Sequence, residues 1–281
     1  MSIKTTVITG PTSGIGRETA LALAKKDHAL YLLVRNVPKG EALKQEIITK
    51  TGNKSIHVVK CDLADLHSVK EAADELKAKL VSINVLINNA GGTNNKRVLS
   101  KDGYEMTFAM NHLGHFALTM QLMPLLEKGH ARIINVSSDG HKLGKPNFDD
   151  LQWEHTPYSA LKAYSNAKLY NIYFTKSLAE RYADKGITSF ALHPGVVKTG
   201  FGADLSGIFK FLLSIMRPFM ITPEKGAETS VYLATEPGMD AKSQQYFEKK
   251  KVAKSSALSW DEKNRIKLWD ISEKLVKKVL G

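Results

Sequence analysis

Short runs of β-branched residues alternate with longer amphipathic stretches along the chain, and this alternation limits the folds that the sequence can adopt. A strand that is followed by a helix and a second strand returns to the same end of a sheet, so such strands run parallel. The six clearest strand segments are Thr5–Thr9, Ala29–Val34, Ser55–Cys61, Val85–Asn88, Arg132–Ser137 and Thr188–His193. Gln244–Glu248 is expected to add an edge strand. The pattern predicts an α/β fold with a doubly wound, about seven-stranded parallel sheet and helices on both faces.

Helical spacing of apolar residues fills the intervals between these strands. The expected helices are Ile15–Lys26, Glu41–Thr51, Ser68–Leu80, His112–Glu127 and, the longest, about Tyr158–Asp184. Ser259 followed by Glu262 is typical of a capping box and predicts a last helix through about Leu280. Because the alternation never resets and no linker or repeat interrupts it, residues 1–281 are expected to form a single domain.

The composition fits a globular protein without an internal disulfide. The chain has 281 residues, a formal net charge of +12 and one cysteine, Cys61. A single cysteine favours a reducing, cytoplasmic location. No signal peptide is expected, because no basic start precedes an apolar run. The longest apolar stretch, Ile208–Ile221, contains Lys210 and Arg217 and is shorter than the roughly 20 residues of a membrane span.

The excess positive charge is expected to attract anionic small molecules rather than nucleic acid. The Lys249–Lys251 run with Lys254 lacks the interleaved aromatic residues of a nucleic-acid surface, and we expect a solvated loop or edge strand there. The nine histidines show no HExxH or other tight ligand spacing, so no metal site is predicted. Peripheral contact with a membrane stays open, as does the choice between monomer and homo-oligomer.

A glycine-rich turn joins the first expected strand to the first expected helix. It reads Thr9-Gly10-Pro11-Thr12-Ser13-Gly14-Ile15-Gly16-Arg17. Such a turn presents backbone N–H groups and the positive end of a helix to a phosphate, and a β-carbon would hold the phosphate away. No Gly-Lys-Ser/Thr follows, which excludes a P-loop. The turn therefore predicts a Rossmann-type site for the pyrophosphate of a dinucleotide.

The end of the second strand indicates which dinucleotide is bound. In NAD-binding folds an acidic residue about 20 positions past the glycines binds the ribose 2′-hydroxyl. Here the sequence is Val34-Arg35-Asn36, and the first acidic residue is Glu41. A guanidinium binds a 2′-phosphate in a bidentate fork, whereas a carboxylate repels it. NADP(H) is therefore favoured; the alternative for Arg35 is an ordinary exposed charge.

Five motifs in order resemble the short-chain dehydrogenase/reductase family over nearly the whole chain. They are the TGxxxGxG turn, Asn88-Asn89-Ala90-Gly91, Ser138 after the fifth strand, Tyr164-Ser165-Asn166-Ala167-Lys168, and His193-Pro194-Gly195 with Thr199 beyond. The resemblance implies an oxidoreductase that uses a nicotinamide. The cofactor contacts that it implies are Gly10, Thr12, Ser13, Gly14, Ile15, Gly16, Arg35, Asn36, Asp62, Leu63, Asn89, Ala90, Gly91, Tyr164, Lys168, Pro194, Gly195, Val197 and Thr199. For Asp62 the alternative is a turn or cap role with Asp65.

The resemblance also implies a catalytic set of Asn111, Ser138, Tyr164 and Lys168. Reduction of a carbonyl places negative charge on oxygen, so a donor must supply a proton. The tyrosine pKa of ~10 is too high for ready exchange near neutrality, and the Lys168 ammonium is expected to lower it. Ser138 would polarise the substrate oxygen. Asn111 would hold a water that relays protons to Lys168; a buried side chain bonded to backbone is the other interpretation, and it is compatible with that role.

A second YxxxK pair, Tyr158 and Lys162, precedes Tyr164 and Lys168 by six residues. Six residues rotate a helix by about 600°, so the two pairs face roughly 120° apart and only one can face the cofactor. Ala167 beside Lys168 is small, and Tyr158 directly follows a proline. Tyr164 is therefore predicted to be the acid–base, and Tyr158 a pocket or surface residue.

Two other polar residues lie beside these motifs. Ser137 precedes Ser138; strand alternation turns them to opposite faces, and the resemblance favours Ser138. His193 belongs to the motif implied to shape the nicotinamide pocket. A structural role is therefore expected for His193, rather than that of a base.

The interval of 26 residues between Ser138 and Tyr164 is long for this family and resembles its retinol dehydrogenase-like branch. Asn111–Phe116, His193–Val197 and Gly226–Ser230 agree with that branch. The sequence starts close to its first expected strand, so the N-terminal anchor of the vertebrate membrane members is not expected. We therefore expect a lipophilic aldehyde or ketone as substrate, with retinal as the narrowest case.

The segment Phe201–Met220 is apolar with interspersed lysine and arginine, and follows Thr199. It is expected to form a substrate lid at about 200–222. The alternatives are a helix that packs on the core and a helix that lies on a membrane surface. For the whole protein, the alternative to an enzyme is an NADP(H)-sensing regulator on the same fold, which usually lacks the tyrosine or lysine that this chain retains.

Overall fold

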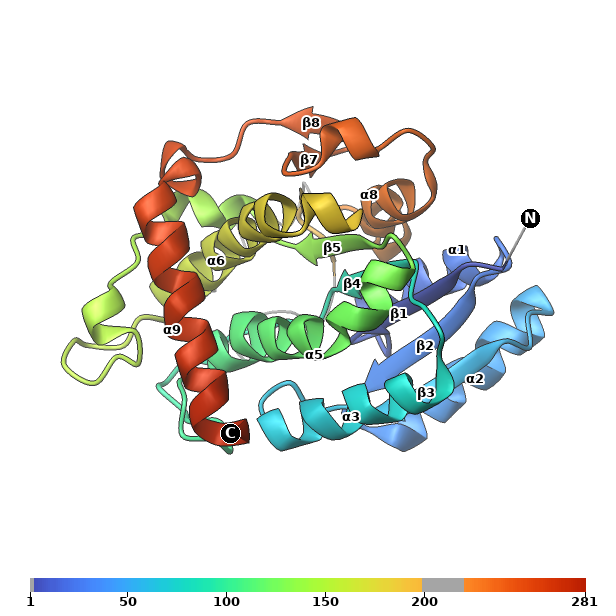
Figure 1. Cartoon of the computed structure of the whole chain (residues 1–281), viewed down its shortest axis with the longest axis horizontal. Coiled ribbons are helices and arrows are strands. Elements are labelled where there is room, and N and C mark those ends of the chain that lie inside the picture. Colours follow the sequence, from blue (N-terminus) through green and yellow to red (C-terminus); the bar gives the residue numbers. More distant parts are fainter. Residues whose placement is uncertain (1–2, 199–219) are drawn as a thin grey trace.

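The computed structural model describes residues 3–198 and 220–281. In these residues one sheet has the strand order β3-β2-β1-β4-β5-β6-β7-β8 (Figure 1). The strands are β1 (Thr5–Thr9), β2 (Ala29–Val34), β3 (Ile56–Lys60), β4 (Val85–Asn88), β5 (Arg132–Val136), β6 (Thr188–His193), β7 (Tyr246–Glu248) and β8 (Lys251–Ala253). Strands β1 to β7 pair in parallel. The order reverses between β1 and β4, and a crevice forms at the carboxyl ends of the strands at such a point.

Helices cover both faces of this sheet, which confirms the predicted doubly wound α/β fold. The helices are α1 (Gly14–Ala24), α2 (Val37–Thr51), α3 (Leu66–Lys79), α4 (Met106–Phe108), α5 (Gly114–Lys128), α6 (Ala160–Arg181), α8 (Pro223–Thr235) and α9 (Glu262–Leu280). The apolar side chains of α1, α2 and α8 share one core with one face of the sheet. Those of α3, α5 and α6 share the other core, which α9 also covers; Figure 1 shows α9, in red, lying across α6.

The far edge of the sheet carries one strand more than expected. Lys249 and Lys250 have φ values of 50° and 64° and reverse the chain after β7, so that β8 returns antiparallel to it. A tight turn of this kind can join only antiparallel strands. The Lys249–Lys251 run is therefore the tip of an exposed hairpin.

Two helices begin later than the sequence predicts, because a different residue caps each of them. Asp261 caps α9 by accepting a 2.9 Å hydrogen bond from the Asn264 N–H. The predicted capping box at Ser259 is wrong, since Ser259 lies in the preceding 3-10 turn Ala257–Trp260. Helix α6 begins after Ser159, whose hydroxyl accepts from the Lys162 N–H, so Tyr158 lies before the helix.

The helix that contains Asn111 begins earlier than predicted and changes its winding at that residue. Glu105 caps α4 with two 2.8 Å hydrogen bonds from the N–H groups of Thr107 and Phe108. A π turn, Ala109–Leu113, then leads into α5. Asn111 therefore lies within a turn that holds one residue more than an α-helical turn, a feature that often occurs at functional sites.

No helix within the described ranges is both long and apolar enough to cross a membrane. Across the same ranges, no group of three or more His, Cys, Asp or Glu side chains could hold a metal ion. Thr199 and nearly all of the expected lid at about 200–222 lie outside the described residues.

Candidate active site

A cleft of about 1260 Å³ opens where β1, β2, β4, β5 and β6 end. Of the expected cofactor residues, Thr199 lies outside the described ranges, and the others all line this cleft. They are Gly10, Thr12, Ser13, Gly14, Ile15, Gly16, Arg35, Asn36, Asp62, Leu63, Asn89, Ala90, Gly91, Tyr164, Lys168, Pro194, Gly195 and Val197. The fold thus brings together residues that the sequence separates by almost two hundred positions, and their individual roles stay predictions.

Gly10 and Gly16 shape the turn between β1 and α1. Gly10 has a φ of 61°, in the left-handed region that favours glycine. A β-carbon on Gly16 would lie 2.4 Å from the Gly10 carbonyl oxygen and 2.4 Å from Asn89 Nδ2. In the part of the chain that the structure describes, the Ser13 side chain makes no capping bond to α1, and the first turn holds no acidic residue. The first N–H groups of α1 can therefore bind an anion, which fits a pyrophosphate.

Two cations flank the start of α2 at the β2 end of the cleft. Arg35 and Lys39 are both exposed and both line the cleft. The Asn36 side chain caps α2 by accepting a 3.0 Å hydrogen bond from the Lys39 N–H. Sequence reasoning missed Lys39, although the cap at Asn36 followed by Pro38 would have placed it in the first helical turn. This end of the cleft combines two positive side chains with a helix N-terminus.

Asp62 takes the turn role that the sequence left open. Its Oδ1 accepts a 3.0 Å hydrogen bond from the Ala64 N–H, and its own N–H donates to the Ser68 hydroxyl at 3.0 Å. Asp65 caps α3 by accepting from the N–H groups of His67 and Ser68. Asp62 also lines the cleft, so its place in the turn holds its carboxyl group at the cleft wall.

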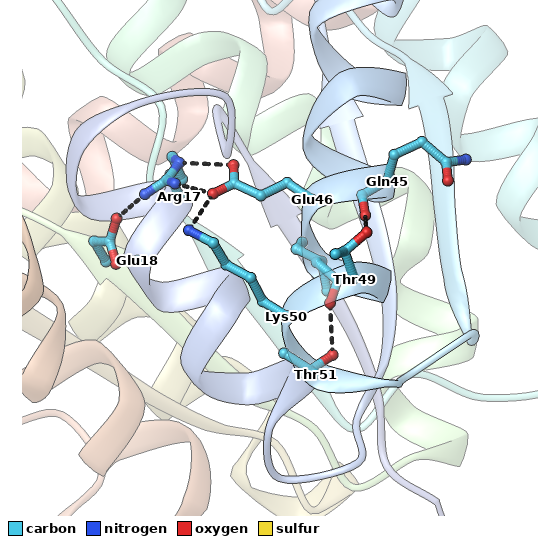
Figure 2. Close-up of polar contacts among 8 residues, drawn as sticks. Arg17, Glu18, Gln45, Glu46, Thr49, Lys50 and Thr51 are labelled. Carbon is cyan, nitrogen blue, oxygen red and sulfur yellow. Dashed lines mark hydrogen bonds and ion pairs between the residues drawn. The ribbon is translucent and has the colours of Figure 1, made fainter.

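Ionic contacts fix α1 against α2 beside the cleft (Figure 2). Arg17, the last residue of the glycine-rich turn motif, pairs with Glu18 on α1 and with Glu46 on α2. Lys50 donates a 2.6 Å hydrogen bond to the same Glu46. The hydrogen bonds from Lys50 and Arg17 hold the pKa of Glu46 below its ordinary value. The helix that presents the phosphate turn is thus tied to the helix that carries Lys39.

Ser138, Tyr164 and Lys168 meet at the β5 end of the cleft. Lys168 Nζ lies 5.6 Å from the centroid of the Tyr164 ring, one helical turn away on α6. A side-chain hydrogen bond joins Ser138 to Tyr164, and the Ser138 hydroxyl accepts a 3.1 Å bond from the Gly140 N–H. A β-carbon on Gly140 would lie 3.4 Å from Tyr164 Cε1 and 3.5 Å from Ser138 Oγ. The hydroxyl groups of Ser138 and Tyr164 and the ammonium of Lys168 therefore lie close together at this end of the cleft.

The pKa of Tyr164 differs from the expectation, and the pKa of Lys168 is shifted as well. Burial raises the pKa of Tyr164, and the hydrogen bond with Ser138 acts in the opposite direction. Lys168 is buried, and burial lowers its pKa to about 8. Its ammonium donates a 3.1 Å hydrogen bond to the Val136 carbonyl oxygen. In the protein alone, the expected lowering of the tyrosine pKa is thus not found, because desolvation of the phenol outweighs the other effects.

Asn111 lies behind the cleft wall and is fully buried. Its amide nitrogen donates to the carbonyl oxygens of Gly92 at 2.8 Å and Thr107 at 2.7 Å, and its Oδ1 accepts from the Gly92 N–H at 3.2 Å. A β-carbon on Gly91 would lie 2.6 Å from Asn111 Oδ1 and 3.2 Å from Lys168 Nζ. The Asn111 side chain is therefore buried and bonded to backbone, which is compatible with the predicted relay role, and it lies close to Lys168.

The three neighbouring residues that compete with this set each make a hydrogen bond that involves none of its side chains, although Ser137 and His193 also line the cleft. The Tyr158 hydroxyl donates to Glu105 Oε1 at 3.0 Å and lies 3.1 Å from the Thr107 hydroxyl. The Ser137 hydroxyl donates to the Lys168 carbonyl oxygen at 2.7 Å. His193 Nδ1 accepts a 3.3 Å hydrogen bond from the Asp139 N–H. Each makes a bond that fixes backbone or a neighbouring element.

Apolar side chains from outside the expected cofactor set also line the cleft. Sequence reasoning singled out only Met220, at the end of the expected lid; the others come from a loop, from the π turn, from the 3-10 turn Asp139–Leu143 and from the first turn of α6. The set is Val98, Met110, Leu143, Leu161 and Met220. Leu143 and Val98 remain 58% and 44% exposed, so the apolar surface continues to the mouth of the cleft.

Comparison with known proteins places these features in a family. Residues 4–207 match the family model described as short chain dehydrogenase. Mouse retinol dehydrogenase 11 is 40% identical over 270 residues, which cover 96% of this chain and 85% of that protein. Human retinol dehydrogenase 13 is 37% identical over 280 residues, which cover 97% of this chain and 84% of that protein.

Solved structures share the fold. An uncharacterized protein from Mycobacterium paratuberculosis superposes with a TM-score of 0.78 at 32% identity and covers 98% of this chain and 93% of its own. A variant of the actinorhodin polyketide ketoreductase with NADPH superposes with a TM-score of 0.69 at 25% identity and covers 87% and 95%.

Proposed function

The chain is a member of the short-chain dehydrogenase/reductase family, of its retinol dehydrogenase-like branch, and from this premise we propose that it interconverts a lipophilic aldehyde or ketone and the corresponding alcohol with NADP(H). Membership makes it a hydride-transfer oxidoreductase that acts on a CH–OH or C=O group of a small molecule. The preference for NADP(H), the lipophilic substrate and the residue roles below form the proposal.

The observation that carries the proposal is the convergence of Tyr164, Ser138 and Lys168 at one end of the cleft whose other parts fit a dinucleotide. The Ser138–Tyr164 hydrogen bond places two hydroxyl groups where a substrate oxygen could accept from both. Lys168 lies close behind them, with its ammonium directed by the Val136 carbonyl. This is the arrangement that proton transfer to a developing alkoxide needs.

A nicotinamide bound in the cleft would supply hydride to the carbonyl carbon, or accept it from the alcohol. The chain's own residues would manage the charge on oxygen. Tyr164 donates its phenolic proton to the oxygen, and Ser138 orients and polarises the same oxygen. The Lys168 ammonium stabilises the phenolate that Tyr164 becomes, and a second proton, drawn from solvent, then reaches the tyrosine through Lys168 and the buried region beside Asn111.

The β2 end of the cleft supports NADP(H) as the cofactor. Arg35 and Lys39 place two positive charges beside the N-terminus of α2, and the first acidic residue after β2, Glu41, lies in α2 beyond them. A 2′-phosphate gains charge-assisted hydrogen bonds from such a site, while a bare ribose gains none. The actinorhodin ketoreductase structure, which contains NADPH, is consistent with this preference.

The apolar lining beside Tyr164 supports a lipophilic substrate. Met110, Leu143 and Leu161 offer the surface that an aliphatic chain or polyene would cover. Each methylene that they bury is worth up to ~0.8 kcal/mol. The names of the similar retinol dehydrogenases agree with a lipophilic alcohol or aldehyde.

Purified protein assayed with NADPH against straight-chain aldehydes of graded length tests this function. We expect NADPH oxidation with aldehydes, with kcat/KM rising as the chain lengthens until the cleft is filled. Absence of turnover with every aldehyde and ketone, together with NADPH binding, would instead favour the cofactor-sensing alternative.

A further inference from the structure

His115 lies on α5, one helical turn after Asn111, and is buried. Its Nδ1 lies 3.1 Å from the Asn111 carbonyl oxygen, and its Nε2 lies 2.9 Å from the hydroxyl oxygen of Thr9. Thr9 is the last residue of β1 and the first of the glycine-rich turn, and is 1% exposed. One imidazole therefore joins the π turn of Asn111 to the strand that leads into the phosphate turn.

The partners of the ring determine where its proton lies. A carbonyl oxygen can only accept, so Nδ1 carries the hydrogen and donates it to Asn111. Burial lowers the pKa of His115 to about 4, and the ring is neutral near pH 7. Nε2 is then an acceptor, and the Thr9 hydroxyl donates to it.

The Thr9 oxygen completes the chain of bonds on its other side. It accepts hydrogen bonds from the N–H groups of Asn89 and Ala90, both 3.0 Å long. These N–H groups belong to the segment after β4 that lines the cleft. The single hydrogen of the Thr9 hydroxyl makes the shorter contact with the imidazole, at 2.9 Å, rather than the 3.4 Å contact with the Ile87 carbonyl oxygen. Both lone pairs of the hydroxyl oxygen can therefore hold this backbone.

Both ends of this chain of bonds lead to the catalytic end of the cleft. Asn111 bonds both the N–H and the carbonyl of Gly92, and the neighbouring Gly91 lies against Lys168. Asn89 Nδ2 donates to the carbonyl oxygens of Thr9 and Gly10, at 2.9 and 3.1 Å. Thr9 thus holds the start of the segment Asn89–Gly92, and Asn111 holds its end. His115 is hydrogen-bonded to both of these residues.

We propose that His115 is a positioning residue that sets the backbone of Asn89–Gly92 against Lys168, and so fixes the nicotinamide end of the cleft. The proposal rests on the proposed function, since it assumes that a nicotinamide lies along this segment. A displacement of about 1 Å at a reacting centre can lower a rate by roughly 10²-fold with little change in binding. Loss of His115 should therefore lower kcat far more than it alters the KM for NADPH.

Paired substitutions separate the two bonds of the ring. In His115→Asn the amide can take the place of Nδ1 and keep the bond to Asn111, and the bond to Thr9 is lost. In His115→Gln the amide reaches the place of Nε2 and keeps the bond to Thr9. Thr9→Val removes the hydroxyl, and Thr9→Ser retains it as the conservative rescue. His115→Phe removes both bonds.

The chain offers a matched control in His112, three residues earlier, in the π turn that leads into α5. His112 is equally buried, and its Nε2 lies 2.9 Å from the Ser272 hydroxyl of α9. His112→Phe should change stability as a buried histidine substitution does, without touching the bonds to Thr9 and the Asn111 carbonyl.

The first readout is amide hydrogen exchange at Asn89 and Ala90 in the full chain without cofactor, which does not depend on activity. We expect exchange about 10-fold faster or more in Thr9→Val, His115→Phe and His115→Asn, and near wild-type exchange in Thr9→Ser, His115→Gln and His112→Phe. Wild-type exchange at both amides in His115→Phe would overturn the proposal.

The second readout is steady-state kinetics with NADPH and a long-chain aldehyde. We expect kcat to fall by about 10- to 100-fold in His115→Phe while the KM for NADPH changes by less than about threefold. The proposal would be overturned if kcat of His115→Phe fell no further than kcat of His112→Phe, with the two variants equal in free energy of unfolding. If the wild-type protein reduces no carbonyl, the proposed function fails, and the exchange measurement still decides whether His115 holds this backbone.

Discussion

The Lys168 ammonium and the Val136 carbonyl oxygen lie 3.1 Å apart, a hydrogen bond that joins α6 to the end of β5. The Asn171 side chain donates to the same oxygen, also at 3.1 Å. A buried cation held in this way costs less to desolvate than an unbonded one, yet its pKa still falls to about 8. The charge that the proposed role of Tyr164 requires is therefore present near neutrality and is lost in mild alkali.

The first prediction concerns the alkaline limb of the pH profile. Lys168 is charged below its pKa of about 8 and neutral above it, so kcat/KM for carbonyl reduction should fall as the pH rises through about 8. In Lys168→Arg the guanidinium stays charged, and the fall near pH 8 should vanish from the activity that remains. A profile for the wild-type protein that stays flat to pH 10 would contradict the assignment.

The second prediction concerns the choice of cofactor. Arg35→Asp replaces a cation that can bind a 2′-phosphate with a repelling charge, a change of ~2–4 kcal/mol if the pair is bidentate. We expect NADPH to bind roughly 10²-fold more weakly, with NADH affected far less. Lys54→Asp makes the same change in charge at an exposed position before β3 and should leave both Kd values unchanged. Equal Kd values for NADPH and NADH in the unmutated protein would disprove the preference.

The third prediction concerns substrate length. Leu161 lines the cleft, and Leu161→Ser should reduce kcat/KM for long aldehydes more than for short ones, because each methylene loses part of its ~0.8 kcal/mol of burial. Ile266→Ser is the control, since Ile266 is exposed on α9 at 46%. An equal loss of kcat/KM for short and long aldehydes would show that Leu161 does not contact the alkyl chain of the substrate.

The fourth prediction concerns stability in acid. Burial lowers the pKa of His112 to about 3 and of His115 to about 4. Below the ordinary histidine pKa of ~6.5 the unfolded chain takes up protons that the folded protein does not. The free energy of unfolding should therefore fall as the pH drops from about 6.5 towards 4, by up to ~1.4 kcal/mol per pH unit for each histidine. Urea titrations at pH 7 and pH 5 measure it, and His115→Gln should lessen the slope.

The parts of the fold that depend on a short stretch of sequence could be predicted from the sequence. The β-branched runs predict every strand from β1 to β6 within two residues. Apart from β3, in which buried and exposed residues mix, these strands are buried on both faces and therefore appear in the sequence as apolar runs. The shape of the glycine-rich turn is likewise predictable from its sequence, since there is no room for a β-carbon at Gly10 or Gly16. The cleft residues follow, because parallel strands must end at one edge.

The remaining features depend on competition between neighbours that one sequence does not resolve. Ser259 and Asp261 can each cap a helix, and the 3-10 turn at Ala257–Trp260 decides for Asp261. Asn111 could begin a helix, but the Glu105 cap starts it earlier and leaves Asn111 in a π turn. The hydrogen bond between His115 and Thr9 joins residues 106 positions apart, and no periodicity in the sequence predicts it.

The two tyrosines of the YxxxK pairs offer the most direct test of the central claim, that Tyr164 is the acid–base of a carbonyl reductase. Tyr164 lines the cleft, whereas the Tyr158 hydroxyl is bonded to Glu105 before α6 begins. The measurement is kcat for NADPH-dependent reduction of a long-chain aldehyde by Tyr164→Phe and Tyr158→Phe. We predict a loss of about 10²-fold or more for Tyr164→Phe, as for removal of a general acid, with most activity kept by Tyr158→Phe. The reverse order, or equal activity in the two variants, would contradict the account.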